Sequence, residues 1–243
     1  MSARHGVAMG LFTFLALGSA VSARAQQNEK LDARAKSAAH VLANLVSDPK
    51  NAPPNKLLRS AECIAVIPSV KEAAMVVGGK VGYGLASCRV GQAWSLPTYM
   101  ALKAGSVGFQ IGGQAADVVL VFTHADAPEF IAHSNFELGG QASVAAGPVG
   151  STIGAGTDFK QGSAIYSYST KGAGAFVGVS LAGSKFEVDD KGNRSAYPAS
   201  TVPTTADKSP DVAKLLKMPA GTDAPDGVKP FVTALNERIG TAR

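Results

Sequence analysis

Few residues in this sequence of 243 have types and spacings that suit chemistry. Glycines cluster between Gly78 and Gly84, as in phosphate-binding loops, but the dinucleotide spacing and a Gly-Lys-Ser/Thr ending are both missing. Glu129 and His133 are four residues apart, as metal ligands on a helix can be, but no third ligand lies nearby. A hairpin explains the glycines better, and an exposed helix surface explains the Glu–His pair. We therefore predict no metal site and no cofactor.

Two serine-containing patterns match hydrolase motifs only in part. Residues 104–108 miss the Gly-x-Ser-x-Gly register of a nucleophile elbow. Ser47 and Lys50 fit the letters Ser-x-x-Lys, but they lie in a proline-broken loop without the companion motifs. The sequence therefore predicts a protein that is not an enzyme. The remaining catalytic alternative, a hydrolase assembled by the fold, requires a deep cleft lined by His124 or His133 with several carboxylates.

The first 25 residues are typical of a secretory signal peptide. Arg4 precedes a mostly apolar run from residue 7 to 21, and the small residues Ala23 and Ala25 suit cleavage after Ala25. The apolar run is too short for a spanning anchor. We therefore expect an exported protein that is periplasmic, associated with an outer membrane, or secreted.

The two cysteines, Cys63 and Cys88, both lie in the expected mature chain. In an oxidising compartment they are permitted to form a disulfide. Cys63 also begins an apolar run at residues 63–67, which is a typical setting for a buried thiol that behaves as a small hydrophobe. The sequence leaves a disulfide and two separate thiols as equal alternatives.

The composition indicates a globular protein with little net charge. Hydrophobic residues make up 46% of the chain and charged residues 17%, which is too apolar for a disordered segment. The formal net charge of +5 falls to +3 when Arg4 and Arg24 leave with the signal peptide. Lysines and arginines are scattered along the chain and are not interleaved with aromatic residues, so we expect no nucleic-acid partner.

The helices and strands that would position a functional site can be predicted from the spacing of apolar residues. Apolar residues at helical spacing predict an amphipathic helix over residues 29–46. Short runs rich in Val, Ile, Phe and Tyr then alternate with glycines and predict a sheet. The expected strands are residues 63–68, 74–81, 83–89, 108–112, 117–123, 140–146, 163–169 and 175–181.

The fold class that these elements predict is α+β. We expect a mainly antiparallel, strongly curved or barrel-like sheet, capped by the N-terminal helix and followed by short C-terminal helices. The domain occupies residues 26–197, and residues 198–243 form a linker and a short helical extension.

Several short motifs occur in an order that resembles the SYLF lipid-binding domain family. They are Cys63-Ile64-Ala65-Val66-Ile67-Pro68, Gly78-Gly79 with Gly82-Tyr83-Gly84, Trp94-Ser95 with Pro97, residues 108–114 with 117–121, Gly147-Pro148-Val149-Gly150, and residues 164–169 with 171–172 and 178–181. The resemblance implies a lipid-binding domain whose N-terminal helix takes part in membrane contact. Its eukaryotic members bind phosphoinositides and some fungal members bind actin. For an exported chain, the nearest equivalent partner is an anionic phospholipid surface.

The resulting hypothesis is a peripheral membrane protein that binds anionic phospholipid through the 29–46 helix and basic surface residues. Apolar helix residues would enter the bilayer, each contributing at most roughly 1.5–3 kcal/mol. Lysines and an arginine would contact headgroups, and a tryptophan would anchor in the headgroup zone. The candidate lipid-binding residues are Lys30, Leu31, Arg34, Leu42, Leu45, Lys71, Lys80, Trp94 and Lys103.

The main alternative places the apolar stripe of the 29–46 helix against the protein's own sheet. The protein would then be an envelope structural or protein-interaction module without lipid binding. The direction in which Leu31 and Leu42 face separates the two hypotheses.

Overall fold

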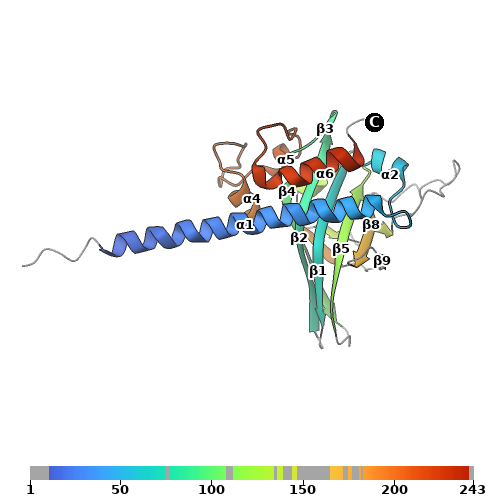
Figure 1. Ribbon diagram of the computed structural model, residues 1–243, viewed down its shortest axis with the longest axis horizontal. Coiled ribbons are helices and arrows are strands. Elements are labelled where there is room, and N and C mark those ends of the chain that lie inside the picture. Colours follow the sequence, from blue (N-terminus) through green and yellow to red (C-terminus); the bar gives the residue numbers. More distant parts are fainter. Residues whose placement is uncertain are drawn as a thin grey trace, which may run out of the picture.

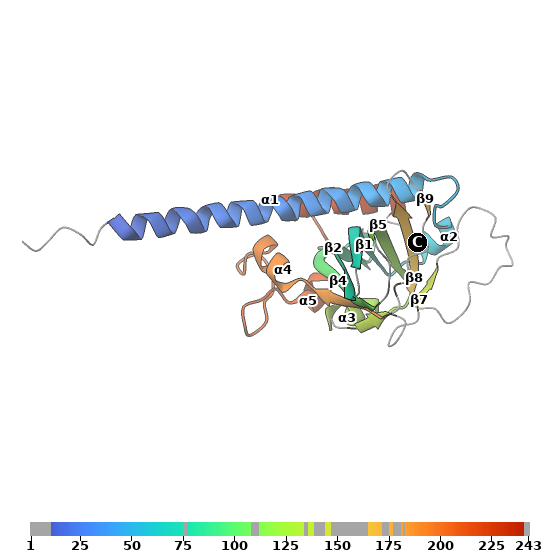
Figure 2. The same cartoon turned by 90° about the horizontal axis from the view of Figure 1, so that it is seen from below.

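A computed structural model describes residues 11–74, 77–107, 112–133, 136–138, 144–146, 165–171, 175–176, 181 and 183–240. It shows a strongly curved sheet crossed on one face by a long N-terminal helix, with short helices toward the C-terminus (Figures 1 and 2). The predicted α+β class, with a mainly antiparallel curved sheet, is therefore confirmed.

The sheet is built around four long strands in the order β4-β2-β1-β5. These are β1 (Cys63–Ala74), β2 (Val77–Val90), β4 (Thr98–Val107) and β5 (Gly112–Phe122). On the β4 side, β10 (Ser184–Val188) and β6 (Phe136–Leu138) extend the sheet, and on the β5 side β8 (Ile165–Lys171) and β7 (Val144–Ala146) do so. The short strands β3 (Ala93–Trp94) and β9 (Ala175–Phe176) pair with β2 and β8. The pairings are antiparallel except for β7 with β8.

Helix α1 (Leu11–Ser47) crosses the sheet, and its N-terminal half projects beyond it (Figure 1). Helix α6 (Lys229–Ile239), preceded by the 3-10 helix η2 (Asp226–Val228), packs along α1. The remaining helices are α2 (Asn55–Arg59), α3 (Ala127–Ala132), α4 (Asp190–Ala196) and α5 (Val212–Leu215). No described helix has a stretch long and apolar enough to cross a bilayer.

The sheet separates two apolar cores. Toward α1 and α6, one core combines helix residues such as Leu31 and Leu42 with strand residues such as Ile64 and Leu85. The opposite face packs Phe122, Phe186 and their neighbours beneath α3 and α5. Residues of the C-terminal segment, among them Leu215 and Phe231, are fully buried. That segment is therefore part of the packed body.

Sequence patterns predicted some elements better than others. The predicted 29–46 helix lies within α1, and strands near 63–68, 117–123 and 163–169 are present. The strands β4 and β10 were not predicted, because alanine, lysine and glycine interrupt the apolar pattern of β4 and because β10 is only five residues long and contains two charged residues. Their pairing partners, β2 on one side and β6 on the other, hold them in the sheet. Most of the predicted strand at 108–112 and parts of those at 140–146 and 175–181 lie outside the described residues.

The glycines of Gly82-Tyr83-Gly84 let β1 and β2 approach closely at an irregularity. The pairing register of β1 shifts between Val66 and Lys71, where Ser69 has a φ of 48°. A Cβ on Gly84 would collide with the Val66 carbonyl oxygen and lie 2.7 Å from the Ile67 Cα atom. Glycine is therefore required at this position, and the intervening Tyr83 points to the opposite face of the sheet.

We predict that Gly84→Ala lowers the free energy of unfolding by about 3 kcal/mol or more, because the added methyl group meets backbone atoms that cannot rotate away. Gly105→Ala is the matched control, since a Cβ on Gly105 of β4 meets no atom within 4 Å. The control should change stability by about 0.5 kcal/mol or less. Urea denaturation of both variants measures the difference, and equal stabilities would contradict this explanation of the motif.

Candidate functional site

Three lysines lie in one line across four neighbouring strands. Lys71 of β1 pairs with Val81 of β2, Val81 pairs with Lys103 of β4, and Lys103 pairs with Lys185 of β10. Directly paired residues point to the same face of a sheet, so the three ammonium groups share one face. All three side chains are exposed, and that of Lys103 has 51% of its surface accessible. We call Lys71, Lys103 and Lys185 the lysine row.

Apolar groups lie beside the lysine row. Val81 is 40% exposed and Tyr83, two residues along the same strand, is 43% exposed; these are the large hydrophobic side chains found exposed in the described part of the chain. Because side chains alternate along a strand, Tyr83 faces the same side as Val81. The surface therefore combines cationic and apolar groups, as interfacial membrane-binding surfaces do.

Acidic groups limit the charge of this surface. Glu187 Oε2 accepts a hydrogen bond from Lys103 Nζ at 2.6 Å, and this hydrogen bond raises the pKa of the Lys103 ammonium group. Glu137 of β6 lies directly opposite Lys185. The row is therefore mildly basic, and electrostatic attraction alone would hold an anionic partner weakly.

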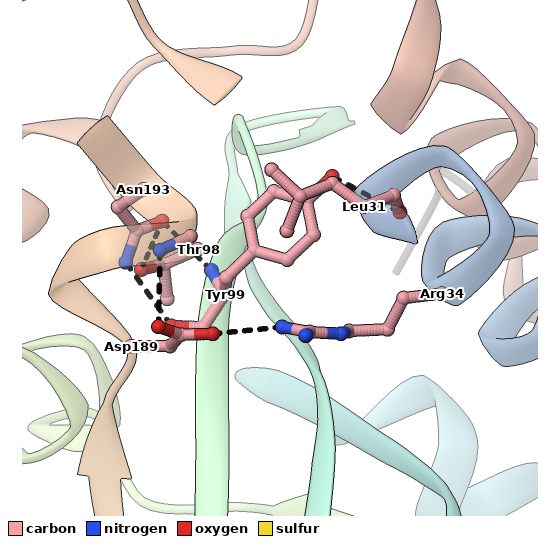
Figure 3. Close-up of polar contacts among 7 residues, drawn as sticks. Leu31, Arg34, Thr98, Tyr99, Asp189 and Asn193 are labelled. Carbon is pink, nitrogen blue, oxygen red and sulfur yellow. Dashed lines mark hydrogen bonds and ion pairs between the residues drawn. The ribbon is translucent and has the colours of Figure 1, made fainter. Parts of the chain in front are cut away.

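A clamp at the end of this surface holds α1 to the sheet (Figure 3). Arg34 Nη1 donates to Asp189 Oδ2 at 2.8 Å, and both side chains are largely buried, with 18% and 16% of their surfaces accessible. The Arg34 guanidinium carbon lies 4.9 Å from the Tyr83 ring centroid and 5.7 Å from that of Tyr99. Asp189 also accepts a hydrogen bond from the Gly192 amide and so caps α4. One arginine therefore connects α1, the sheet and α4.

Asn193 of α4 completes the clamp. Its Oδ1 atom accepts from the Tyr99 backbone amide at 2.8 Å and from Thr98 Oγ1 at 3.2 Å, and its Nδ2 atom donates to the Tyr99 carbonyl at 3.1 Å. Burial and the negative charge of Asp32 raise the pKa of the Tyr99 hydroxyl, which therefore stays neutral. These bonds fix α4 against β4 and hold Asp189 in place for Arg34.

The apolar residues predicted to enter a bilayer are buried in the protein instead. Leu31 and Leu42 are 1% exposed and Leu45 is 3% exposed, all in the core between α1 and the sheet. The expectation of a free apolar stripe on the 29–46 helix is therefore corrected. The helix is rich in alanine, and Ala35 and Ala38 at 0% exposure let it lie close to the strands.

Trp94 is also not an interfacial anchor. Its side chain is fully buried, with the Arg89 guanidinium carbon 4.6 Å from the ring centroid. Arg89 in turn donates to the carbonyl oxygens of Ala61, Leu58 and Gly240. The predicted anchor is thus corrected to a packing residue that joins β3 to the C-terminal end of α6.

The predicted basic residues separate into three groups. Lys71 and Lys103 belong to the lysine row, and Lys185, which the sequence prediction missed, completes it. Lys30 is exposed on α1 and is not part of the row, and Arg34, also on α1, forms an ion pair with Asp189. Lys80 faces the opposite side of the sheet and pairs with Glu72 at 3.4 Å. No sequence signal identified Lys185, because the row exists only through strand pairing.

The structure decides the pairing of the cysteines and locates the two histidines. Cys63 and Cys88 lie opposite each other on β1 and β2, are fully buried and form a disulfide. His124 and His133 are both exposed. Glu129 forms an ion pair with Lys217 at 2.6 Å. The described residues contain no group of three or more metal-ligating side chains of the His, Cys, Asp or Glu types.

The fold is that of an α+β protein with a curved, mainly antiparallel sheet packed against an N-terminal helix. Comparison with known proteins identifies its family. Residues 103–238 match the family model described as "Ysc84: Las17-binding protein actin regulator". The chain belongs to this Ysc84/SYLF family.

Curated relatives agree with this assignment. The chain is 32% identical over 146 residues to SH3 domain-containing YSC84-like protein 1 of Xenopus laevis, covering 59% of this chain and 43% of the relative. It is 30% identical over 174 residues to the Homo sapiens protein of the same name, covering 69% and 50%. LAS seventeen-binding protein 3 of Saccharomyces cerevisiae is 31% identical over 176 residues, covering 69% and 38%. The chain thus spans about half or less of the length of these relatives.

We predict that Arg34→Met lowers the free energy of unfolding by roughly 1–3 kcal/mol, because it leaves the largely buried Asp189 carboxylate without its cation. Lys229→Met is the control, since it breaks an exposed ion pair with Asp226 and should cost about 0.5 kcal/mol or less. Thermal and urea denaturation of the two variants measure these effects. A loss for Lys229→Met as large as that for Arg34→Met would contradict a special role for the clamp.

Proposed function

We propose that this protein is an exported, non-enzymatic peripheral membrane protein that binds anionic phospholipid through the lysine row, Val81 and Tyr83. The observation that carries the proposal is the alignment of three exposed lysines beside two exposed apolar side chains on one face of the sheet. Membership of the Ysc84/SYLF family supports it. The proposal moves the membrane contact from the apolar stripe of α1 to the sheet.

The lysine row lies toward the end of the strands that is farther from α1. Strands β1, β2 and β5 continue past α1 on one side (Figure 1). The residues of β1 and β2 that pack beneath α1, such as Ile64 and Leu85, lie nearer the Cys63–Cys88 end, whereas Lys71 and Val81 lie nearer the opposite end of the two strands. A bilayer can therefore meet the lysine row while α1 stays packed.

The expected affinity is low. Each lysine near an anionic surface contributes about 1 kcal/mol, and the ion pair with Glu187 reduces the share of Lys103. Val81 and Tyr83 are less than half exposed, so their burial adds on the order of 1 kcal/mol each. A total of about 4 kcal/mol corresponds to millimolar binding by one molecule. The proposed association is therefore reversible and sensitive to salt.

We predict that replacing Lys71, Lys103 and Lys185 together with glutamine weakens binding to vesicles of phosphatidylcholine and phosphatidylglycerol by about tenfold or more, because about 1 kcal/mol is lost per lysine. The matched control replaces Lys50, Lys208 and Lys217, which are also exposed and include one ion-paired lysine, Lys217. Co-sedimentation at low and high salt measures both variants against the unaltered protein.

Two results of this experiment would contradict the proposal. The first is equal binding by the two triple variants, and the second is no binding of the unaltered protein to anionic vesicles at low salt. Indifference to lipid together with a stoichiometric protein partner would favour the alternative, an envelope structural or protein-interaction module. The burial of Leu31 and Leu42 between α1 and the sheet is the observation that favours this alternative.

Export is supported by two features of the chain. Residues 1–25 have the pattern of a signal peptide, and the buried Cys63–Cys88 disulfide is typical of proteins in oxidising compartments. Cleavage after Ala25 would leave residues 26–47 of α1, which include the leucines packed in the core. The mature chain therefore retains the part of α1 that the fold needs.

We predict that protein recovered from an exporting bacterial host begins at Gln26 and has no free thiol after denaturation. Intact-mass spectrometry with and without a thiol-alkylating reagent measures both properties. A variant carrying Ala23→Leu and Ala25→Leu should keep the leader, because bulky residues block the small-residue cleavage site. Retention of residues 1–25 by the unaltered protein would contradict the signal-peptide assignment.

A further inference from the structure

A small pocket of about 170 Å³ lies where α1, β4, α4 and η2 meet. Its polar lining comes from Asn28, Asp32, Tyr99 and Ser195, and its apolar walls include Leu31 and Val228. The volume is sufficient for several water molecules. A ligand of a few non-hydrogen atoms fits this space.

The Asp32 carboxylate gives the cavity its charge. Asp32 is partly buried and forms no ion pair with any residue that the structure describes. A Cβ on residue 227 would overlap Asp32 Oδ1, so the glycine there lets η2 pack directly against the carboxylate. The Ser195 hydroxyl likewise has no hydrogen-bond partner among the described residues. The cavity therefore contains a carboxylate without an ion-pair partner and a hydroxyl without a hydrogen-bond partner among the described residues.

The Tyr99 hydroxyl, a third polar group of the lining, forms only one long hydrogen bond. The Tyr99 hydroxyl lies 3.5 Å from the Leu31 carbonyl oxygen, a long distance for a hydrogen bond, so its oxygen can still accept one from a ligand. The nearest cation in the clamp, Arg34, is already paired with Asp189. An incoming cation would therefore meet oxygen acceptors without competition from Arg34.

We propose that this cavity binds a small primary ammonium compound with a short aliphatic chain, of the aminoalcohol class. The ammonium group donates to Asp32 and to the neutral oxygens of Tyr99 and Ser195, and the methylene groups contact Leu31 and Val228. One carboxylate among neutral oxygens suits a monovalent ammonium better than a divalent metal ion, which usually takes more anionic ligands. The same chemistry is present in a free aminoalcohol and in an ethanolamine headgroup.

The first test is titration of the full chain with ethanolamine, followed by NMR or calorimetry, with ethylene glycol as the neutral analogue. We expect saturable millimolar binding of ethanolamine and none of ethylene glycol. Asp32→Asn should weaken binding by about tenfold or more, because a charge-assisted hydrogen bond is lost. Asp223→Asn, which changes an exposed carboxylate outside the cavity, should leave binding unchanged.

A second variant guards against a folding defect. Ser195→Ala removes one acceptor from the cavity wall and should weaken binding by a few-fold while the melting temperature stays the same. Absence of saturable ethanolamine binding, or equal affinity of the Asp32→Asn variant and the unaltered protein, would overturn the proposal. Either result leaves binding through the lysine row unaffected, because the vesicle experiment above uses no ethanolamine lipid.

A vesicle experiment identifies the source of the ligand. Phosphatidylethanolamine is added to phosphatidylcholine vesicles, and co-sedimentation is compared for the unaltered protein and the Asp32→Asn variant. A gain that Asp32→Asn abolishes supports the cavity as a headgroup site. Binding of soluble ethanolamine without a gain on these vesicles supports a site for the free aminoalcohol.

Discussion

The rest of the structure depends on the burial of the apolar stripe of α1 against the sheet. Leu31, Ala35, Ala38 and Leu42 follow helical spacing and are almost completely excluded from water. Burial of such side chains is the dominant favourable term in folding, and the alanines bring the helix close enough for it to be effective. With α1 in this position, Arg34 reaches Asp189, Asp32 lines a cavity with Tyr99, and the outer part of the strands stays uncovered.

This constraint changes how a membrane contact has to be understood. To insert Leu31 and Leu42 in a bilayer, α1 would first have to leave the sheet, and the gain in the bilayer would only offset the burial lost in the core. The lysine row needs no such rearrangement, because Val81 and Tyr83 are already exposed beside it. The proposed attachment through this surface is weak and reversible. The matched segment covers less than half of the length of the Xenopus and yeast relatives.

Glycine has a structural role that the phosphate-loop and family motifs do not reveal by themselves. Gly82 and Gly84 face the irregular part of β1, where any side chain would collide with the Val66–Ile67 backbone or with Val70. The residue between them, Tyr83, is thereby presented on the opposite face next to Arg34. The glycine motif thus positions an aromatic side chain at the edge of the proposed membrane surface.

The sequence by itself determined the α+β class, the helix that ends near Val46, several strands and the lack of a recognisable catalytic motif, because local periodicity and residue type decide these features. It predicted Lys71 and Lys103 as surface cations but missed β10 and hence Lys185. It also left the cysteine pairing and the direction of the α1 stripe open. Only the tertiary structure decided these three features. Strand register aligns residues more than a hundred positions apart, such as Lys71 and Lys185. An amphipathic pattern requires an apolar partner for the helix but does not specify whether that partner is a sheet or a bilayer.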